Sequence, residues 1–116
     1  AMAVRTPISP ILATLTTVAS ATSYTVPTGC TFTISAATFS NTTATPQSVQ
    51  VDITPSGGAA LTFVGGTTDV TMPAAGSAPV TVPGLVGQSM PSGCKIEIGC
   101  SANTSVNAWI SGYLQQ

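Results

Sequence analysis

Side chains that carry out acid–base or nucleophilic chemistry are scarce in this chain. Of its 116 residues, none is His and five are charged. The charged residues are Arg5, Asp52, Asp69, Lys95 and Glu97. General acid–base and Ser- or Cys-based nucleophilic catalysis normally need an imidazole or a tuned pair of carboxylates. A Ser-Lys arrangement at Lys95 is formally possible, but no fixed spacing supports it. We therefore expect no enzyme, no catalytic residue and no cofactor.

The chain has three cysteines, Cys30, Cys94 and Cys100. An odd count without a visible secretory signal favours reduced thiols that pack as small hydrophobic groups. A Cys30–Cys94 disulfide remains the alternative. No His or second Cys pair completes a four-ligand set around Cys94 and Cys100, so we expect no metal site.

Low charge also limits the partners of the chain. Arg5 and Lys95 are too few and too far apart in sequence to form a basic patch, so we expect no nucleic-acid binding. Thr, Ser, Pro and Gly interrupt every apolar stretch, so we expect no membrane-spanning helix. A folded chain of 11.5 kDa exposes about 5,800 Å². Most of that surface must be covered by uncharged residues, above all the 20 Thr and 13 Ser.

Alternation of apolar and polar residues indicates the elements that carry these side chains. It is clearest in Cys30–Ile34, Val49–Ile53 and Cys94–Cys100, and it is typical of strands with one buried face. We predict strands at Ile11–Val18, Ser23–Val26, Cys30–Ser40, Ser48–Thr54, Ala60–Val64, Thr68–Met72, Pro79–Val82, Cys94–Cys100 and Val106–Leu114. The fold class is therefore all-β: a single antiparallel β-sandwich of jelly-roll or Greek-key type with eight to nine short strands.

Two stretches of the sequence resemble each other. Val26–Ile34 and Met90–Ile98 both read as an apolar residue, Pro, a hydroxyl residue, Gly and Cys, followed by alternation. Repeated ligand sites would be one explanation. We favour repeated turn-into-strand geometry, because Pro and Gly are the residues that tight turns need.

The N-terminal segment differs from the rest of the chain. We expect residues 1–21 to form an arm and residues 22–116 to form the sandwich domain, with Ala1 an expression scar ahead of Met2. The arm contains four large aliphatic residues that would contact a neighbouring subunit. They are Ile8, Ile11, Leu12 and Leu15. The alternative is that this segment forms the first strand of its own sandwich.

Near the C-terminus, the alternation places Val106, Ala108 and Ile110 towards the core. Trp109 and Tyr113 then point outward, where aromatic rings make good contact residues. The reverse parity, with Trp109 in the core, is the alternative.

Four runs together resemble a known family. They are Tyr24–Cys30, Asn41–Thr43, Pro55–Gly58 and Val106–Gly112. This pattern is similar to that of small virion proteins of tailed bacteriophages, over about residues 22 to 114.

The resemblance implies a β-sandwich that is built into the virion and has no catalytic residue. We expect a capsid decoration (cement) protein that forms a dimer or trimer and stabilises contacts between major capsid subunits. Such a protein would be made in the host cytoplasm and would lie on the capsid exterior. The alternative is a tail or fibre-tip module that binds a host-surface glycan through Trp109 with Asn107 or Tyr24.

Overall fold

The computed structural model describes residues 5–18, 21–64, 71–72, 80–81 and 85–116, and the ten elements defined in them are all β-strands. They are β1 (Arg5–Thr14), β2 (Ser23–Thr25), β3 (Thr31–Asn41), β4 (Gln47–Thr54), β5 (Leu61–Val64), β6 (Thr71–Met72), β7 (Val80–Thr81), β8 (Ser89–Met90), β9 (Lys95–Cys100) and β10 (Val106–Gln115). Parts of the strands predicted at Thr68–Met72 and Pro79–Val82 lie outside the described residues.

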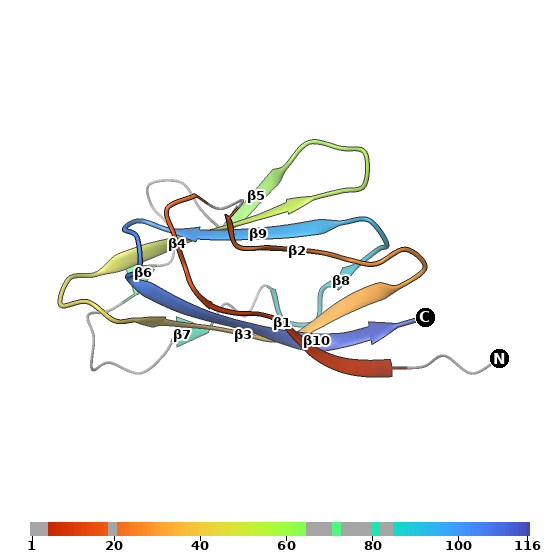
Figure 1. Cartoon of the computed structure of the whole chain (residues 1–116), viewed down its shortest axis with the longest axis horizontal. Helices are drawn as coiled ribbons and strands as arrows, with labels where there is room; N and C mark the ends of the chain where they lie inside the picture. Colours follow the sequence, from red (N-terminus) through yellow and green to blue (C-terminus); the bar gives the residue numbers. More distant parts are fainter. Residues whose placement is uncertain (1–4, 19–20, 65–70, 73–79, 82–84) are drawn as a thin grey trace.

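The strands form two antiparallel sheets that pack face to face (Figure 1). One sheet has the order β1-β10-β3, with β7 and β8 both paired to β3, and the other has the order β2-β9-β4-β5, with β6 paired to β4. The predicted all-β antiparallel sandwich is therefore confirmed. Its strands are more uneven than expected, because β1, β3 and β10 have 10, 11 and 10 residues, while β6, β7 and β8 have two each. The jelly-roll or Greek-key assignment stays a prediction.

The core lies between the sheets and is filled by the apolar residues of the alternating runs. The largest fully buried side chains include Phe32 and Phe39 of β3, Ile96 and Ile98 of β9, and Ile110 of β10. Removing such side chains from water supplies about 1.5–3 kcal/mol each. The period-two pattern therefore fixes which face of each central strand turns inward.

The two similar stretches of the sequence lie side by side at one end of the sandwich. Val26 N–H donates to the Cys94 carbonyl at 2.8 Å, Gly93 N–H donates to the Val26 carbonyl at 3.1 Å, and Gly29 N–H donates to Ser92 Oγ at 3.2 Å. Gly29 and Gly93 have φ of 81° and 83°, a conformation that favours glycine. Turn geometry accounts for this repeat, since each turn leads into the central strand of one sheet.

The segment predicted as an arm is the first strand of the sandwich. β1 pairs with β10 along its whole length, and Leu15 N–H continues the pairing by donating to the Val106 carbonyl at 2.8 Å. Ile11 and Leu15 are 2% and 0% exposed and belong to the core. The prediction of an arm at residues 1–21 is therefore wrong for residues 5–18, because Ile11 and Leu15 fill this chain's own core. β1 also begins at Arg5, earlier than the Ile11 expected from the sequence.

Candidate functional site

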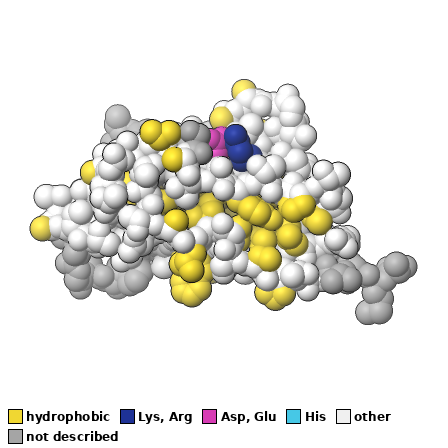
Figure 2. All heavy atoms as spheres, in the orientation of Figure 1, with side chains coloured by type: hydrophobic (Ala, Val, Ile, Leu, Met, Phe, Trp, Pro, Cys, Tyr) yellow, Lys and Arg dark blue, Asp and Glu magenta, His cyan; other side chains and the backbone are white. Residues whose placement is uncertain are grey.

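Charged side chains gather on the outer face of the β2-β9-β4-β5 sheet. Lys95 Nζ lies 3.5 Å from Glu97 Oε1, and Thr54 Oγ1 donates to the same carboxylate oxygen at 3.3 Å. Asp52 is opposite Glu97 in register and accepts from Gln50 Nε2 at 3.0 and 3.2 Å. On the face shown in Figure 2, charged side chains appear at one place, over the sheet that contains β9. Lys95 is therefore paired with a carboxylate on its own strand.

The three cysteines are buried and free. The thiols therefore pack as small hydrophobic groups, and the alternative Cys30–Cys94 disulfide is not formed in this structure. Tyr24 lies near Cys30, and its pKa is raised by burial and, to a smaller extent, by the charge of Cys30. Its ring meets the Phe32 ring edge to face, with centroids 5.5 Å apart. These contacts belong to the core and its border, and they offer no reactive centre.

The outer face of the β1-β10-β3 sheet, called here the neutral face, has a different character. Leu12, Trp109 and Thr38 lie opposite one another across its three strands. Leu12 is 67% exposed and Trp109 is 53% exposed, so the predicted outward orientation of Trp109 is confirmed. Trp109 Nε1 donates to Ser9 Oγ at 3.1 Å, which fixes the plane of the indole ring against β1. This face therefore offers an oriented aromatic ring in uncharged surroundings.

Two β-bulges interrupt the neutral face at the level of Ser111. In the pairing of β1 with β10, Ser9 and Pro10 together lie opposite Ser111. In the pairing of β10 with β3, Ser111 lies opposite Ala36 and Ser35 is the extra residue. An extra residue bends its strand and turns two successive side chains to the same face. Pro10 fits there, because a bulge spares the backbone N–H that proline lacks. The bulges therefore bring three serine hydroxyls to one spot on the neutral face.

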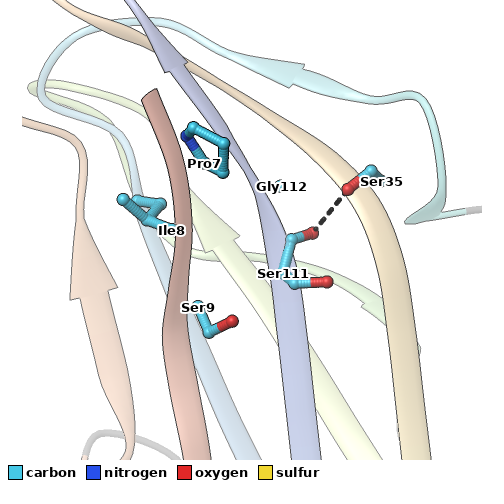
Figure 3. A pocket seen from close by; sticks show the side chains of 6 residues that line it. All are labelled: Pro7, Ile8, Ser9, Ser35, Ser111 and Gly112. Atoms are coloured by element: carbon cyan, nitrogen blue, oxygen red, sulfur yellow. Dashed lines mark hydrogen bonds between the residues drawn. The ribbon is translucent and has the colours of Figure 1, made fainter. Parts of the chain in front are cut away.

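The bulges leave a hollow of about 310 Å³ that is open to solvent. We call it the bulge hollow; its lining residues are Pro7, Ile8, Ser9, Ser35, Ser111 and Gly112. Figure 3 shows Pro7 and Ser9 of β1 leaning towards β10, while Ile8 points to the other side of β1. Ser35 Oγ donates to the Ser111 carbonyl at 3.3 Å, so the β3 wall is tied to the floor (Figure 3). None of the lining residues is charged.

Gly112 forms the floor of the hollow where β10 and β3 come close together. A Cβ atom at this position would lie 1.9 Å from the Thr33 carbonyl oxygen and 3.0 Å from two atoms of the Phe32 ring. Any side chain would therefore push the two strands apart. The next outward residue of β10, Tyr113, has the Arg5 guanidinium 5.1 Å from its ring centroid. Trp109 and Tyr113 thus flank the hollow along β10, with α-carbons about 13 Å apart at 3.3 Å per residue.

The structure separates the six residues predicted to contact partners. Ile11 and Leu15 lie in the core and are corrected as contact residues, because nothing outside the chain can reach them. Ile8 is half-buried against the core. Leu12, Trp109 and Tyr113 share the neutral face, where Leu12 and Trp109 are exposed and Tyr113 is half-buried.

Sequence reasoning missed two groups of residues. Ser9 and Ser35 were not singled out, although the apolar spacing of three, from Ile34 to Ala37 and from Ile8 to Ile11, is the signal of a bulge in a strand of period two. Leu61 and Phe63 of β5, which are 50% and 62% exposed, were also missed. For them no signal existed, since an apolar strand residue is buried in most sheets.

Comparison with protein-family models, with curated proteins and with solved structures gives no match. In the part of the chain that the structure describes, no group of three or more His, Cys, Asp or Glu could hold a metal ion. Within the same residues, no helix is long and apolar enough to cross a membrane. The features that bear on function are therefore the bulge hollow and the exposed apolar residues.

Proposed function

We propose that this chain is a structural protein of a bacteriophage virion, namely a capsid decoration protein. It forms a dimer or trimer and stabilises contacts between major capsid subunits on the capsid exterior. The resemblance to small phage virion proteins supports this role. The observation that carries it is a surface with few charges and two separate exposed apolar patches.

Two patches suit a protein that binds both its own copies and a capsid. One patch is Leu12 with Trp109 on the neutral face, and the other, called here the β5 patch, is Leu61 with Phe63. They lie on different sheets. An interface core is depleted of charged residues, because burying an unpaired charge is costly. The charged residues described around Glu97 lie outside both patches.

The β5 patch is the better candidate for contact between subunits. Within the described residues, β5 pairs only with β4, so it is an edge of its sheet. An edge strand exposes unpaired backbone groups, which proteins often guard with proline or charge. β1, an edge of the other sheet, contains Arg5, Pro7 and Pro10, whereas Leu61–Val64 contains neither proline nor charge. We therefore assign subunit contact to the β5 patch.

The test compares Phe63→Ser with Val18→Ser, which removes another exposed apolar residue outside both patches. Light scattering should give a dimer or trimer for the wild type and for Val18→Ser, and a monomer for Phe63→Ser. Co-sedimentation with capsids assembled from the major capsid protein of the same phage should show binding by the wild type. A monomeric wild type that fails to sediment with capsids would refute the proposal.

A further inference from the structure

We propose that the bulge hollow, with Trp109 at its rim, binds one ring of a neutral saccharide. This goes beyond the assembly role, because it gives the neutral face a ligand of its own. Trp109 also belongs to the apolar patch of this face, so a bound sugar and a capsid surface would compete for it, whereas the β5 patch lies on the other sheet.

The size and the lining of the hollow fit a sugar ring. Its 310 Å³ lies at the lower end of the range for small-molecule sites, about 300–1,000 Å³. Ser9, Ser35 and Ser111 come from three adjacent strands and are brought together by the two bulges. A hydroxyl both donates and accepts, as do the hydroxyls of a sugar. The polar groups of the ligand and of the hollow can therefore satisfy one another without charge.

Trp109 supplies the flat apolar surface that a sugar ring needs. One face of a pyranose carries several C–H groups, which pack on an aromatic ring while the hydroxyls point outward. The hydrogen bond from Trp109 Nε1 to Ser9 Oγ ties the indole edge to the wall of the hollow. The ring is thus oriented before a ligand arrives, and little side-chain entropy is lost on binding. Exposure of 53% leaves much of the ring accessible.

The charge distribution favours a neutral ligand over an acidic one. No basic residue lines the hollow. The Arg5 guanidinium packs on the Tyr113 ring. Arg5 itself pairs with Gln115, which is further along β10 from Ser111 than Tyr113 is. An anionic sugar in the hollow would lose hydration of its carboxylate without gaining a charged partner among the lining residues. An apolar ligand would cover the serine hydroxyls without offering them further hydrogen bonds, so a neutral saccharide fits best.

The experiment is a titration of the full chain with single sugars, monitored by the fluorescence of Trp109, the only Trp in the sequence. The neutral probes are glucose, galactose, rhamnose and N-acetylglucosamine, and the acidic probes are glucuronic acid and N-acetylneuraminic acid. At least one neutral sugar should shift the emission saturably below about 10 mM, an affinity in the weak range for one small ring. The acidic probes should be weaker by about tenfold or more. The absence of a saturable shift with every neutral sugar, or preference for an acidic one, would overturn the proposal.

Variants identify the site, with binding measured by calorimetry because some lack the fluorophore. Trp109→Ala should weaken binding at least about tenfold, as loss of a stacking ring does at other sites. Ser111→Ala should weaken it severalfold through the loss of one hydrogen bond. Phe63→Ser should bind sugar like the wild type, although it is expected to lose subunit contact. Unchanged affinity in Trp109→Ala would overturn the site, whereas an unchanged oligomer in Phe63→Ser would count against the β5 contact alone.

Discussion

The outer faces of the two sheets differ in the way their polar groups are used. On the β2-β9-β4-β5 sheet, Lys95, Glu97 and Asp52 lie together and interact with one another and with Thr54 and Gln50. On the neutral face, Ser9 and Thr38 lie beside Trp109, Arg5 packs on the Tyr113 ring, and the pairings of β10 with β1 and with β3 are both bulged. On the charged sheet, Lys95 and Asp52 have partners within the chain, and the pairing of β4 with β5 also contains a register shift. The neutral face has a hollow, where Ser9 Oγ accepts from Trp109 and Ser35 Oγ donates to the Ser111 carbonyl.

This difference bears on how a chain with five charged residues is stabilised. Paired charges on the surface contribute little to stability, about 0–1 kcal/mol, so the core must stabilise the fold. On the neutral face, the apolar side chains of Leu12 and Trp109 remain exposed. The predictions that follow test this division, first through the backbone and the core, and then through the charges.

The largest effect is expected from Gly112→Ala at the floor of the bulge hollow. The added Cβ would lie 1.9 Å from the Thr33 carbonyl oxygen, so β10 and β3 must separate where their register shifts. We expect a loss of more than about 3 kcal/mol in the free energy of unfolding, as overpacking in a rigid site produces. Urea denaturation followed by circular dichroism measures this loss.

Gly58→Ala is the matched control for that substitution. A Cβ at Gly58 would meet Pro55 side-chain atoms at 3.4–3.6 Å, which is close to ordinary contact. Its stability should stay within about 0.5 kcal/mol of the wild type. Equal stability of the Gly112 and Gly58 variants would show that the close approach of β10 to β3 is not needed for the fold.

The next effect compares Leu15→Ala with Leu12→Ala, two leucines three residues apart. Leu15 is fully buried and Leu12 is 67% exposed. We expect Leu15→Ala to cost about 2–5 kcal/mol and Leu12→Ala less than about 0.5 kcal/mol. Deletion of residues 1–16 should likewise unfold the chain, since it removes β1. A stable, β-rich truncated chain would restore the interpretation of this segment as an arm.

The sequence predicted the central strands well because their signal is local. In Cys94–Cys100 and Val106–Ile110, every second residue is apolar, and all of those residues are buried in the structure, as is Gly99. The outward direction of Trp109 followed from the same parity. Period-two alternation therefore identified the all-β class and most of the core without knowledge of the pairing.

The bulge hollow could not be predicted, because it depends on how three strands are paired. In the sequence, Ser35 looks like an ordinary outward-facing residue after the buried Ile34. Only the pairing of β3 with β10 shows that Ser35 is the extra residue of a bulge. The role of β1 was left open between an arm and a first strand for a related reason. Its prolines interrupt the alternation, although proline is tolerated in an edge strand. Long-range register decides such features, and local composition does not record it.

A smaller effect is expected from Lys95→Met on the charged face. Asp52 and Glu97 are directly opposite each other, and Lys95 lies 3.5 Å from Glu97. Removing Lys95 leaves two like charges on neighbouring strands, which is unfavourable. We expect a loss of about 0.5–1 kcal/mol that shrinks in 1 M salt, where charges are screened over about 3 Å. Glu97→Gln should be milder, because it also removes the repulsion. A larger loss for Glu97→Gln would show that its bond with Thr54 matters more than the charges.

The smallest effect concerns Tyr24 of β2, whose hydroxyl titrates at alkaline pH. Burial, and secondarily the charge of Cys30, raise its pKa in the folded chain. A raised pKa means that the folded state holds this proton more tightly than the unfolded chain does. The resulting stability is fully present below about pH 10, the ordinary value, and is lost as the pH rises through the folded pKa.

Tyr24→Phe keeps the ring against Phe32 but removes the titration, so above about pH 10 its stability should fall less steeply than that of the wild type. The difference should be a few tenths of a kcal/mol, roughly, because solvent screens a half-exposed group. Parallel slopes for the two proteins in urea unfolding between about pH 9 and pH 11 would show that the Tyr24 hydroxyl has the same environment folded and unfolded.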